Sequence, residues 1–510
     1  MKEACDTVIS QVEQRFSQSD HLIATKLVDC SLFPQFVLLF PTSGHYCAVK
    51  LWPLGNEEMF KSELTTLYRY TELHTGNFWH ITDIHWDPTY KLTDNPELVC
   101  ASSGKRPASR AGKYGDYLCD APWQLINSSI YAMKNILPDP DFIFWTGDDT
   151  PHVPNEDLRE EDVLSIIGNL THIIKHVFPS TKVYSALGNH DYHPKSQLPA
   201  AQNYMYEQIT HLWQSWLEPE SQTTFRTGGY YTEKLLNRPG YRVVVLNTNL
   251  YYDQNKVTEE MDDPAGQFNW MDQVLIKAAN DHEKVYITGH VPPGFFEKKR
   301  SKAWFRSHFN KRYLDLIQKH HNIIIGQFFG HHHTDSFRMF YSSGDGSPIS
   351  TMFLTPGVTP WKTTLPGVID GANNPGIRIF EYDTQTLLVK DFVTFYLNLT
   401  HANKAKARWE KEYRLTESFR VPDASPASMH HVLKRMADNH RYLQKYYEFN
   451  SVNYDLTECD NDCRIDHVCA AMEVDFQRYD SCVNNKGPML TNNAWSPVLC
   501  LAVSVVWANC

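Results

Sequence analysis

Phe78-Trp79-His80-Ile81-Thr82-Asp83-Ile84-His85 is a short apolar run that ends in an Asp and a His. Later apolar runs end in the same kinds of residue, in the segments Gly147-Asp148-Asp149, Gly188-Asn189-His190-Asp191, Gly289-His290 and Gly330-His331-His332-His333. A single Asp or His after a strand usually caps a helix or makes a hydrogen bond within a loop. Five such segments in one chain are hard to obtain by chance, so they indicate a single site.

The residue types in these segments are those of a two-metal centre. Asp, Asn and His supply oxygen and nitrogen donors, and no cysteine takes part. Two cations about 3.5–4 Å apart need one shared carboxylate and further ligands on each side. In Asp83-Ile84-His85 and His331-His332-His333, an extended backbone would point both outer residues at one centre. We therefore expect the middle residue His332 to face away from the metals or into solvent.

From Phe78 onward, short apolar runs alternate with helical stretches. Short apolar runs are typical of strands buried on both faces, and the alternation predicts an α/β fold with functional loops at the carboxyl ends of its strands. The candidate strands are Phe78–Ile84, Asp141–Thr146, Lys182–Leu187, Tyr241–Asn247, Lys284–Thr288, Asn322–Gln327, Ile349–Leu354 and Ile377–Tyr382. The candidate helices are Pro122–Ile136, Leu158–Phe178, Gln267–Asn280 and Ala303–His320.

Composition narrows the class of protein. Of the 510 residues 42% are hydrophobic and 21% charged, which allows a sizeable core and excludes a disordered or fibrous chain. The net charge of −11 gives no overall attraction to a phosphate backbone, so we expect no nucleic-acid polymer as a partner. No apolar stretch reaches the length of a conventional membrane span. We expect a monomer.

Cysteines and sequons point to an oxidising compartment. Six of the eleven cysteines lie between residues 76 and 485, an even number that suits three disulfides. The late four resemble a zinc knuckle only superficially, because no His stands at finger spacing. Sequons begin at Asn127, Asn169 and Asn398. Together these features favour the secretory pathway and a cell-surface or extracellular protein.

The order of the five segments, D-x-H, G-D, G-N-H-D, G-H and G-H-x-H, resembles that of the calcineurin-like metallophosphoesterases. The runs Trp145–Asp148 and Asn247–Tyr252 are similar to acid sphingomyelinase and its relatives. The tracts His290–Lys298 and Thr355–Val368 most resemble the b-type branch of the acid sphingomyelinase-like phosphodiesterases. The resemblance covers about residues 76–485. It implies a four-layer α/β/β/α sandwich with a small helical, disulfide-bonded C-terminal subdomain.

The resemblance also assigns residues to the site. It makes Asp148 the carboxylate that bridges two Zn²⁺ ions per chain. Asp83, His85 and His333 would complete one zinc site, and Asn189, His290 and His331 the other. His190 and His152 would face the substrate phosphate and protonate the leaving oxygen. Proximity and the family together predict the disulfides Cys100–Cys119, Cys459–Cys463 and Cys469–Cys482.

The ends of the chain differ from the middle. We expect an atypical leader at residues 1–75, a metallophosphoesterase domain at 76–400, a helical subdomain at 401–485 and a hydrophobic tail at 486–510. The apolar run 494–507 behind a polar spacer is typical of a glycosylphosphatidylinositol (GPI) signal, with Asn485 as the attachment residue. A loosely packed terminal strand is the alternative.

The predicted activity is hydrolysis of a phosphodiester or pyrophosphate bond by a hydroxide held between the two zinc ions. The family implies nucleotide-type or lipid-related substrates, with modulation of membrane lipids and innate immune signalling as a related role. Phe295, Phe296 and Trp361 are candidates for stacking a base, or for ordinary loop packing. A phosphomonoesterase with the same metal centre, and a membrane-tethered modulatory protein with a vestigial site, are the alternative functions.

Overall fold

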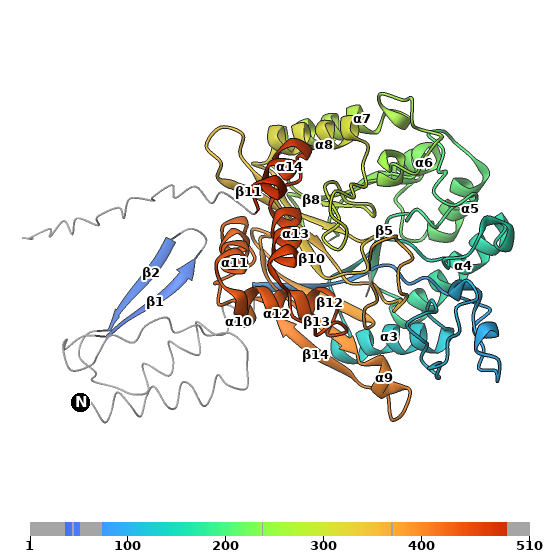
Figure 1. Ribbon diagram of the computed structural model, residues 1–510. Helices are drawn as coiled ribbons and strands as arrows, with labels where there is room; N and C mark the ends of the chain where they lie inside the picture. The colour runs from blue at the N-terminus through green and yellow to red at the C-terminus, as the bar shows by residue number, and fades with distance from the viewer. Residues whose placement is uncertain (1–35, 43–44, 52–73, 237, 369–370, 487–510) are drawn as a thin grey trace, which may run out of the picture.

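The structure is a computed structural model of the 510-residue chain. It describes residues 36–42, 45–51, 74–236, 238–368 and 371–486. The first two ranges are strands β1 (Phe36–Thr42) and β2 (His45–Leu51), which pair antiparallel with each other. The later ranges form two six-stranded sheets with helices around them (Figure 1). Among the described residues, no helix has both the length and the apolar character needed to cross a membrane.

One sheet has the strand order β14-β13-β12-β3-β4-β5. Its strands β3, β4 and β5 run parallel, because the helices α3 and α4 carry the chain back between them. The other three strands add antiparallel at one edge. The bounds are β3 (Thr75–Ile81), α3 (Trp123–Ile136), β4 (Phe142–Trp145), α4 (Glu160–Val177), β5 (Lys182–Ser185), β12 (Gly376–Asp383), β13 (Val389–Leu397) and β14 (Trp409–Arg414).

The other sheet has the order β10-β11-β9-β8-β7-β6. Strands β7, β8, β9 and β11 are parallel, and β6 and β10 close the two edges antiparallel. The bounds are α5 (Tyr204–Trp213), α6 (Pro219–Gly228), β6 (Tyr231–Lys234), β7 (Tyr241–Val245), α7 (Gln267–Asn280), β8 (Lys284–Thr288), α8 (Ser307–His320), β9 (Ile324–Phe329), β10 (Ser336–Tyr341) and β11 (Pro348–Leu354).

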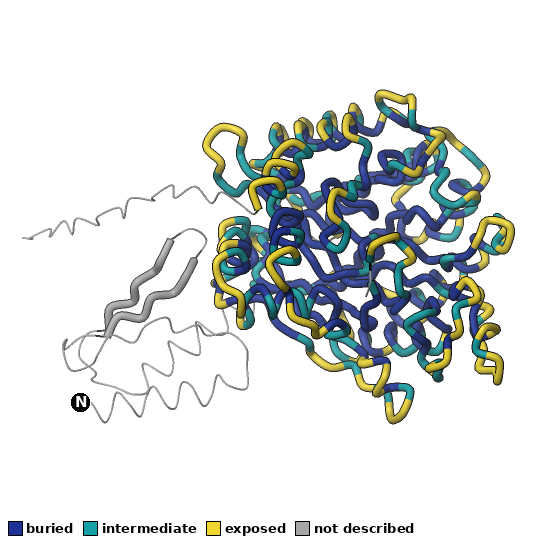
Figure 2. Tube along the Cα trace, in the orientation of Figure 1, coloured by how far each residue is buried: buried dark blue, intermediate teal, exposed yellow. Residues whose placement is uncertain are grey.

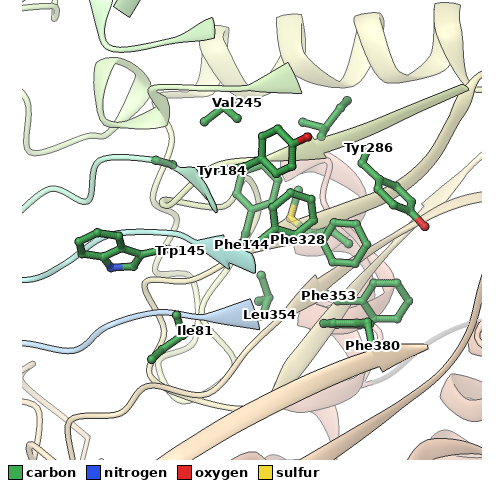
Figure 3. Close-up of a cluster of buried hydrophobic side chains, with 14 of the residues drawn as sticks. Ile81, Phe144, Trp145, Tyr184, Val245, Tyr286, Phe328, Phe353, Leu354 and Phe380 are labelled. Carbon is green, nitrogen blue, oxygen red and sulfur yellow. The ribbon is translucent and has the colours of Figure 1, made fainter. Parts of the chain in front are cut away.

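Aromatic side chains fill the space between the sheets. Phe78 of β3 lies 4.5 Å from Phe142 and 5.1 Å from Phe380 in its own sheet, and 5.2 Å from Phe328 of the facing sheet, measured between ring centroids. Figure 3 shows Phe328, Phe353 and Phe380 gathered in this layer. In Figure 2 the buried residues run through the strands, and the exposed ones lie on outer helices and loops. This core holds the two sheets in fixed register beneath the loops that follow their strands.

The chain continues past residue 400 with strand β14, which pairs with β13, so the sandwich reaches Arg414. Six helices belong to the region that follows β13: α9 (Leu399–Ala402), α10 (Leu415–Phe419), α11 (Pro426–Asp438), α12 (His440–Asn450), α13 (Asn461–Met472) and α14 (Phe476–Asn484). The disulfide Cys459–Cys463 ties the approach to α13, and Cys469–Cys482 joins α13 to α14. With Cys100–Cys119 these are the three predicted disulfides.

The predicted fold class, an α/β/β/α sandwich with a helical disulfide-bonded C-terminal region, is confirmed. All eight candidate strands and all four candidate helices are present. Strands β1, β2, β6, β10, β13 and β14 were not predicted. The five other cysteines, residues 1–73 of the predicted leader and residues 487–510 of the predicted tail lie outside the residues whose side chains the structure describes.

Candidate metal centre

The loops that follow β3, β4, β5, β8 and β9 meet at one edge of the sandwich and bring the predicted metal ligands together. The carboxylate of Asp148 lies between the two groups of candidate metal ligands. Its Oδ2 is 3.4 Å from Nε2 of His85 on one side and 3.1 Å from Nε2 of His290 on the other. All three side chains are buried, at 2% exposure or less. Asp148 thus occupies the position that a bridging carboxylate requires.

The donor atoms are spaced as ligands of a metal ion are. Ligands about 2.0–2.2 Å from a tetrahedral zinc lie roughly 3.3 Å from one another. In one group, Nε2 of His333 lies 3.1 Å from Nε2 of His85 and 3.5 Å from Oδ1 of Asp83. In the other, Nδ1 of His331 lies 3.3 Å from Nε2 of His290. Each His–His pair can share a proton, or can bind a cation when both nitrogens are unprotonated.

Backbone carbonyl groups orient two of the imidazoles. Nδ1 of His85 lies 2.7 Å from the carbonyl oxygen of Thr150, and Nδ1 of His290 lies 2.7 Å from that of Thr146. Each Nδ1–H therefore donates outward, which turns Nε2 toward Asp148. Burial acts to lower the pKa of His85, but the hydrogen bond and charge of Asp148 raise it to about 9. The cluster therefore attracts positive charge.

Three buried atoms in the cluster that could bind a metal ion have no hydrogen-bond partner. They are Oδ1 of Asp83, Oδ1 of Asn189 and Nε2 of His331. A buried polar atom left unpaired costs about 1–3 kcal/mol, so such atoms call for a further partner. The unpaired atoms of Asp83 and Asn189 are oxygens on residues predicted to bind different metal ions. The donor set therefore fits a pair of divalent cations.

The backbone at the ligands is unusual. Asp83, His85, Asp148, His331 and His333 all have positive φ values, between 42° and 78°. The predicted reason for the i, i+2 arrangement, an extended backbone, is therefore wrong for both pairs. Strand β3 ends at Ile81, and the left-handed turns that follow aim Asp83 and His85 into the cluster. Asp, Asn and His tolerate this conformation better than most residues, and the strain is stored at the site.

Glycine is required where loops approach each other. A Cβ atom on Gly188 would stand 2.1 Å from Oδ1 of Asp148, and one on Gly330 would stand 2.1 Å from the hydroxyl of Thr82. The glycines before Asn189 and His331 are therefore needed for close packing of the loops.

Asp191, the last residue of Gly-Asn-His-Asp, holds the bridging carboxylate in place. Its carboxylate accepts hydrogen bonds from the N–H groups of Gly188 at 2.7 Å, Asp148 at 2.8 Å and Asp149 at 2.7 Å. The N–H of His190 in turn donates to Oδ1 of Asp148 at 2.9 Å. Asp191 belongs to the predicted Gly-Asn-His-Asp segment, but no role was predicted for its carboxylate.

His152 and His190 lie beside the cluster. Their rings are 4.4 Å apart, and both are close to the ring of His85, at 4.1 and 4.8 Å. Burial lowers the pKa of both side chains well below the ordinary value. Donor atoms of both also fall within reach of the ligand groups, so proximity alone does not separate ligands from substrate-facing residues.

Two residues hold His152 in place. Asp120, fully buried, accepts from the backbone N–H of His152 at 2.6 Å and lies 3.0 Å from its Nδ1. Trp361 stacks on the imidazole, with 3.6 Å between centroids and 7° between planes. Asp120 was not predicted. Its only sequence signal is its position next to Cys119, 32 residues before the histidine it contacts.

His332 faces away from the cluster, as expected, but not into solvent. Its Nδ1 lies 3.2 Å from Glu297, and its Nε2 accepts from Trp304 at 2.6 Å. Glu297 is 1% exposed and also accepts from Thr334, Arg338 and Asn450, at 2.6, 2.6 and 2.8 Å. His332 therefore joins a buried network that links the loop after β8, the loop after β9 and the end of α12.

The other predicted positions are scattered. Phe295 stacks on Tyr479 of α14 at 3.6 Å and Phe296 packs on His332, so both belong to loop packing. Asn169, Asn398 and Asn485 are exposed, and Asn127 is half-buried on α3. These placements allow glycosylation at Asn169 and Asn398, and leave the attachment role of Asn485 as a prediction.

Comparisons with known proteins agree with this geometry. Residues 76–335 match the family model of the calcineurin-like phosphoesterases, and residues 347–488 match that of the acid sphingomyelin phosphodiesterase C-terminal region. Acid sphingomyelinase-like phosphodiesterase 3b of Mus musculus is 60% identical over 81% of this chain and 91% of its own length. The Homo sapiens protein of that name is 58% identical over the same shares. Cyclic GMP-AMP phosphodiesterase SMPDL3A of Homo sapiens is 41% identical over 80% of this chain and 90% of its own.

The sandwich and its ligand loops define a calcineurin-like phosphoesterase, a class of hydrolases whose fold implies a divalent-metal site. Within that class, the chain belongs to the acid sphingomyelinase-like phosphodiesterases. The predicted resemblance to the b-type branch is thereby confirmed.

Proposed function

We propose that the chain is a phosphodiesterase that works with two zinc ions per molecule. The observation that carries the proposal is the position of Asp148, whose Oδ2 lies within 3.4 Å of imidazole nitrogens from both groups of donors. Asp83, His85 and His333 would hold one ion, and Asn189, His290 and His331 the other. Mixed nitrogen and oxygen donors suit zinc. Bound there, the ions would supply the activation of water and neutralise charge on the phosphate.

The remaining residues would act on the substrate. His190 is buried and His152 half-buried beside the ligands, where an imidazole N–H can donate a hydrogen bond to a phosphate oxygen or, once the ring is protonated, pass a proton to the leaving oxygen. Asp120 and Trp361 fix the ring of His152, which lowers the cost of orienting it during the reaction. Hydrogen-bond donors that are already oriented toward developing charge contribute strongly in a site from which water is excluded.

Nucleotide-type diesters and pyrophosphates are the proposed substrates. A relative 41% identical to this chain is named a cyclic GMP-AMP phosphodiesterase, which supports a nucleotide substrate. Trp361 is buried, with the ring of His152 stacked on it and Arg106 over the ring, so base stacking on Trp361 stays a prediction. Lipid-related substrates, modulation of membrane lipids and innate immune signalling stay predictions.

We place the protein in the secretory pathway, at the cell surface or outside the cell. Three disulfides in a chain of this size support an oxidising compartment. The GPI anchor at Asn485 and the monomeric state stay predictions.

Metal removal and product analysis test this function. Chelation should abolish hydrolysis of bis(p-nitrophenyl) phosphate, and two equivalents of zinc should restore it. The product should be p-nitrophenyl phosphate, with p-nitrophenyl phosphate itself a much poorer substrate. Faster cleavage of the monoester would favour the alternative phosphomonoesterase, and no metal-dependent cleavage of either ester would favour the vestigial site.

A further inference from the structure

His331 is a candidate ligand whose ring no backbone carbonyl group orients. The imidazoles of His85 and His290 each have a carbonyl oxygen 2.7 Å from Nδ1. Among the described residues, only His290 lies within hydrogen-bond distance of the ring of His331, whose Nε2 is buried without a partner. Metal-binding histidines are usually oriented by a hydrogen bond from the other ring nitrogen. The orientation of His331 is therefore set by packing.

Trp304 packs directly on His331. The centroid of its indole lies 4.4 Å from that of the imidazole, and the two rings are nearly perpendicular, at 87°. Tyr252 packs on the same imidazole at 5.3 Å. For comparison, the only described ring near His333 that lies outside the histidine cluster is Trp361, at 6.4 Å. Trp304 is thus the closest ring to His331 in the described part of the chain.

The indole N–H of Trp304 also holds the residue after His331. It donates to Nε2 of His332 at 2.6 Å, while Nδ1 of His332 lies 3.2 Å from the carboxylate of Glu297. Trp304 and Glu297 both lie in the loop between β8 and α8. This loop therefore contacts two consecutive residues of the loop after β9, one by packing and one by hydrogen bonding.

The backbone around Trp304 is itself fixed by the loop after β7, which supplies no candidate ligand. The N–H of Asp253 donates to the carbonyl oxygen of Trp304 at 2.7 Å, and Tyr252 pairs antiparallel with Phe305. The ammonium of Lys302 lies 4.6 Å from the centroid of the indole and 2.7 Å from the carboxylate of Asp253. Because Trp304 is also only 5% exposed, its ring has little freedom to turn.

We propose that Trp304 is a positioning residue for the metal centre, which holds His331 in the orientation that binds an ion. This inference rests on the proposed function and deepens it, because it names a residue on which one of the two zinc ions depends. The ion concerned is the one assigned to Asn189, His290 and His331. His290 lies in the same loop as Trp304, so that loop supplies one ligand of this ion and orients another. Among the described residues, Trp304 forms no hydrogen bond or ring contact with a ligand of the other ion alone.

Zinc binding is measured on the full-length protein after its metal has been removed by chelation. Zinc is titrated in competition with a chromophoric chelator, which gives a dissociation constant for each ion. Trp304→Leu removes the aromatic ring, and Trp304→Phe keeps a smaller ring but removes the N–H. Trp216→Leu is the matched control, because Trp216 is 6% exposed and has the ammonium of Lys175 4.8 Å from its ring centroid, but belongs to the segment after α5.

Trp304→Leu should raise the dissociation constant of one zinc ion by roughly 10–100-fold, the usual effect of removing a residue that orients a metal ligand, and leave the other constant unchanged. Trp304→Phe should have a smaller effect, because its ring can still pack on His331. Turnover of bis(p-nitrophenyl) phosphate by Trp304→Leu should be low at two equivalents of zinc and return toward the wild-type value as free zinc is raised. Trp216→Leu should keep both zinc affinities.

A double variant assigns the effect to His331. If Trp304 acts through His331, adding Trp304→Leu to His331→Ala should weaken zinc binding no further than His331→Ala alone.

Equal weakening of both ions by Trp304→Leu, no weakening, or a further loss in the double variant would overturn the inference. If Trp304→Leu fails to fold, Trp304→Phe decides alone, and unchanged affinity for both ions would then refute the positioning role. If the wild-type protein binds fewer than two zinc ions, the proposed function fails and this inference fails with it. Two tightly bound ions in both the wild type and Trp304→Leu would refute the inference alone.

Discussion

Asp148 and His190 lie in neighbouring loops but are expected to have different roles in the reaction. Asp148 Oδ2 faces an imidazole nitrogen from each donor group, whereas the backbone N–H of His190 supports the other carboxylate oxygen. A residue between two metal ions controls whether they bind. A residue that acts only as charge develops on the phosphate controls the rate of reaction. Metal content and turnover are therefore separable by mutation.

Asp148→Asn should empty or distort the metal pair, and metal content and turnover should fall together. His190→Ala should keep about two zinc ions per chain, while turnover of bis(p-nitrophenyl) phosphate falls by roughly 10²–10⁴, as is typical for loss of a general acid. Metal content is measured by elemental mass spectrometry on protein whose folding is checked by circular dichroism. Loss of zinc from His190→Ala would make His190 a ligand.

Single residues also show what the sequence can and cannot predict. All seven candidate ligands lie in recognisable motifs that follow predicted strands, so their position in the site was predictable. Asp120 was not, because it contacts His152 across 32 residues and belongs to no motif. The left-handed backbone at five ligands was also missed. It depends on how the loops pack against one another, which residue spacing does not encode.

At the level of elements, the predicted strands are those buried on both faces. β3, β4 and β8 are short apolar runs, which the sequence marks clearly. β14, with the sequence Trp-Glu-Lys-Glu-Tyr-Arg, is an edge strand rich in charge, and such strands lack an apolar signal. β10 and β6 are also edge strands. The missed strand β13 lies inside a sheet, and its apolar positions are interrupted by Lys390 and Asp391.

Glu297 connects three of these elements through buried contacts. Burial acts to raise its pKa, but Arg338 and His332 hold it well below the ordinary value, so the carboxylate is ionised. Thr334 and Asn450 satisfy its other oxygen. Together with two hydrogen bonds between Asp335 and Asn450, this carboxylate fixes the loop that carries His331 and His333 to α12. Removing that charge leaves Arg338 buried without a counter-ion.

Glu297→Gln should lower the free energy of unfolding by about 3–5 kcal/mol, the usual cost of breaking a buried ion pair. The matched control is Glu259→Gln, which removes a carboxylate 2.9 Å from Arg306 at a half-exposed site and should cost less than about 1 kcal/mol. Urea denaturation followed by tryptophan fluorescence gives both values. Similar costs for the two variants would show that Glu297 is not needed to compensate Arg338.

At the scale of the whole molecule, the catalytic fold is contained in residues 74–486. β3 begins at Thr75, the ligands span Asp83 to His333, and the last disulfide closes at Cys482. Both family models also fall almost wholly within this range, at 76–335 and 347–488. No candidate ligand lies before it.

A chain of residues 74–486, secreted behind an exogenous signal peptide, should therefore keep the specific activity of the full-length protein within about twofold. Its unfolding temperature should also be unchanged, because both six-stranded sheets lie within residues 75–414 and are kept whole. Both are measured on deglycosylated protein, and the full-length protein is the control. Failure to fold, or a tenfold loss of activity, would show that the first 73 residues are part of the working enzyme.

The contact between Glu297 and Asn450 also has a consequence for biosynthesis. Every candidate ligand has been synthesised once His333 is made, but Asn450 follows only after 450 − 333 = 117 further residues. At typical translation rates that gap lasts roughly ten seconds. A nascent chain, or a product of premature termination in this interval, would carry the full set of ligands on loops that α12 has not yet tied down. Completion of translation therefore limits when the hydrolase becomes competent.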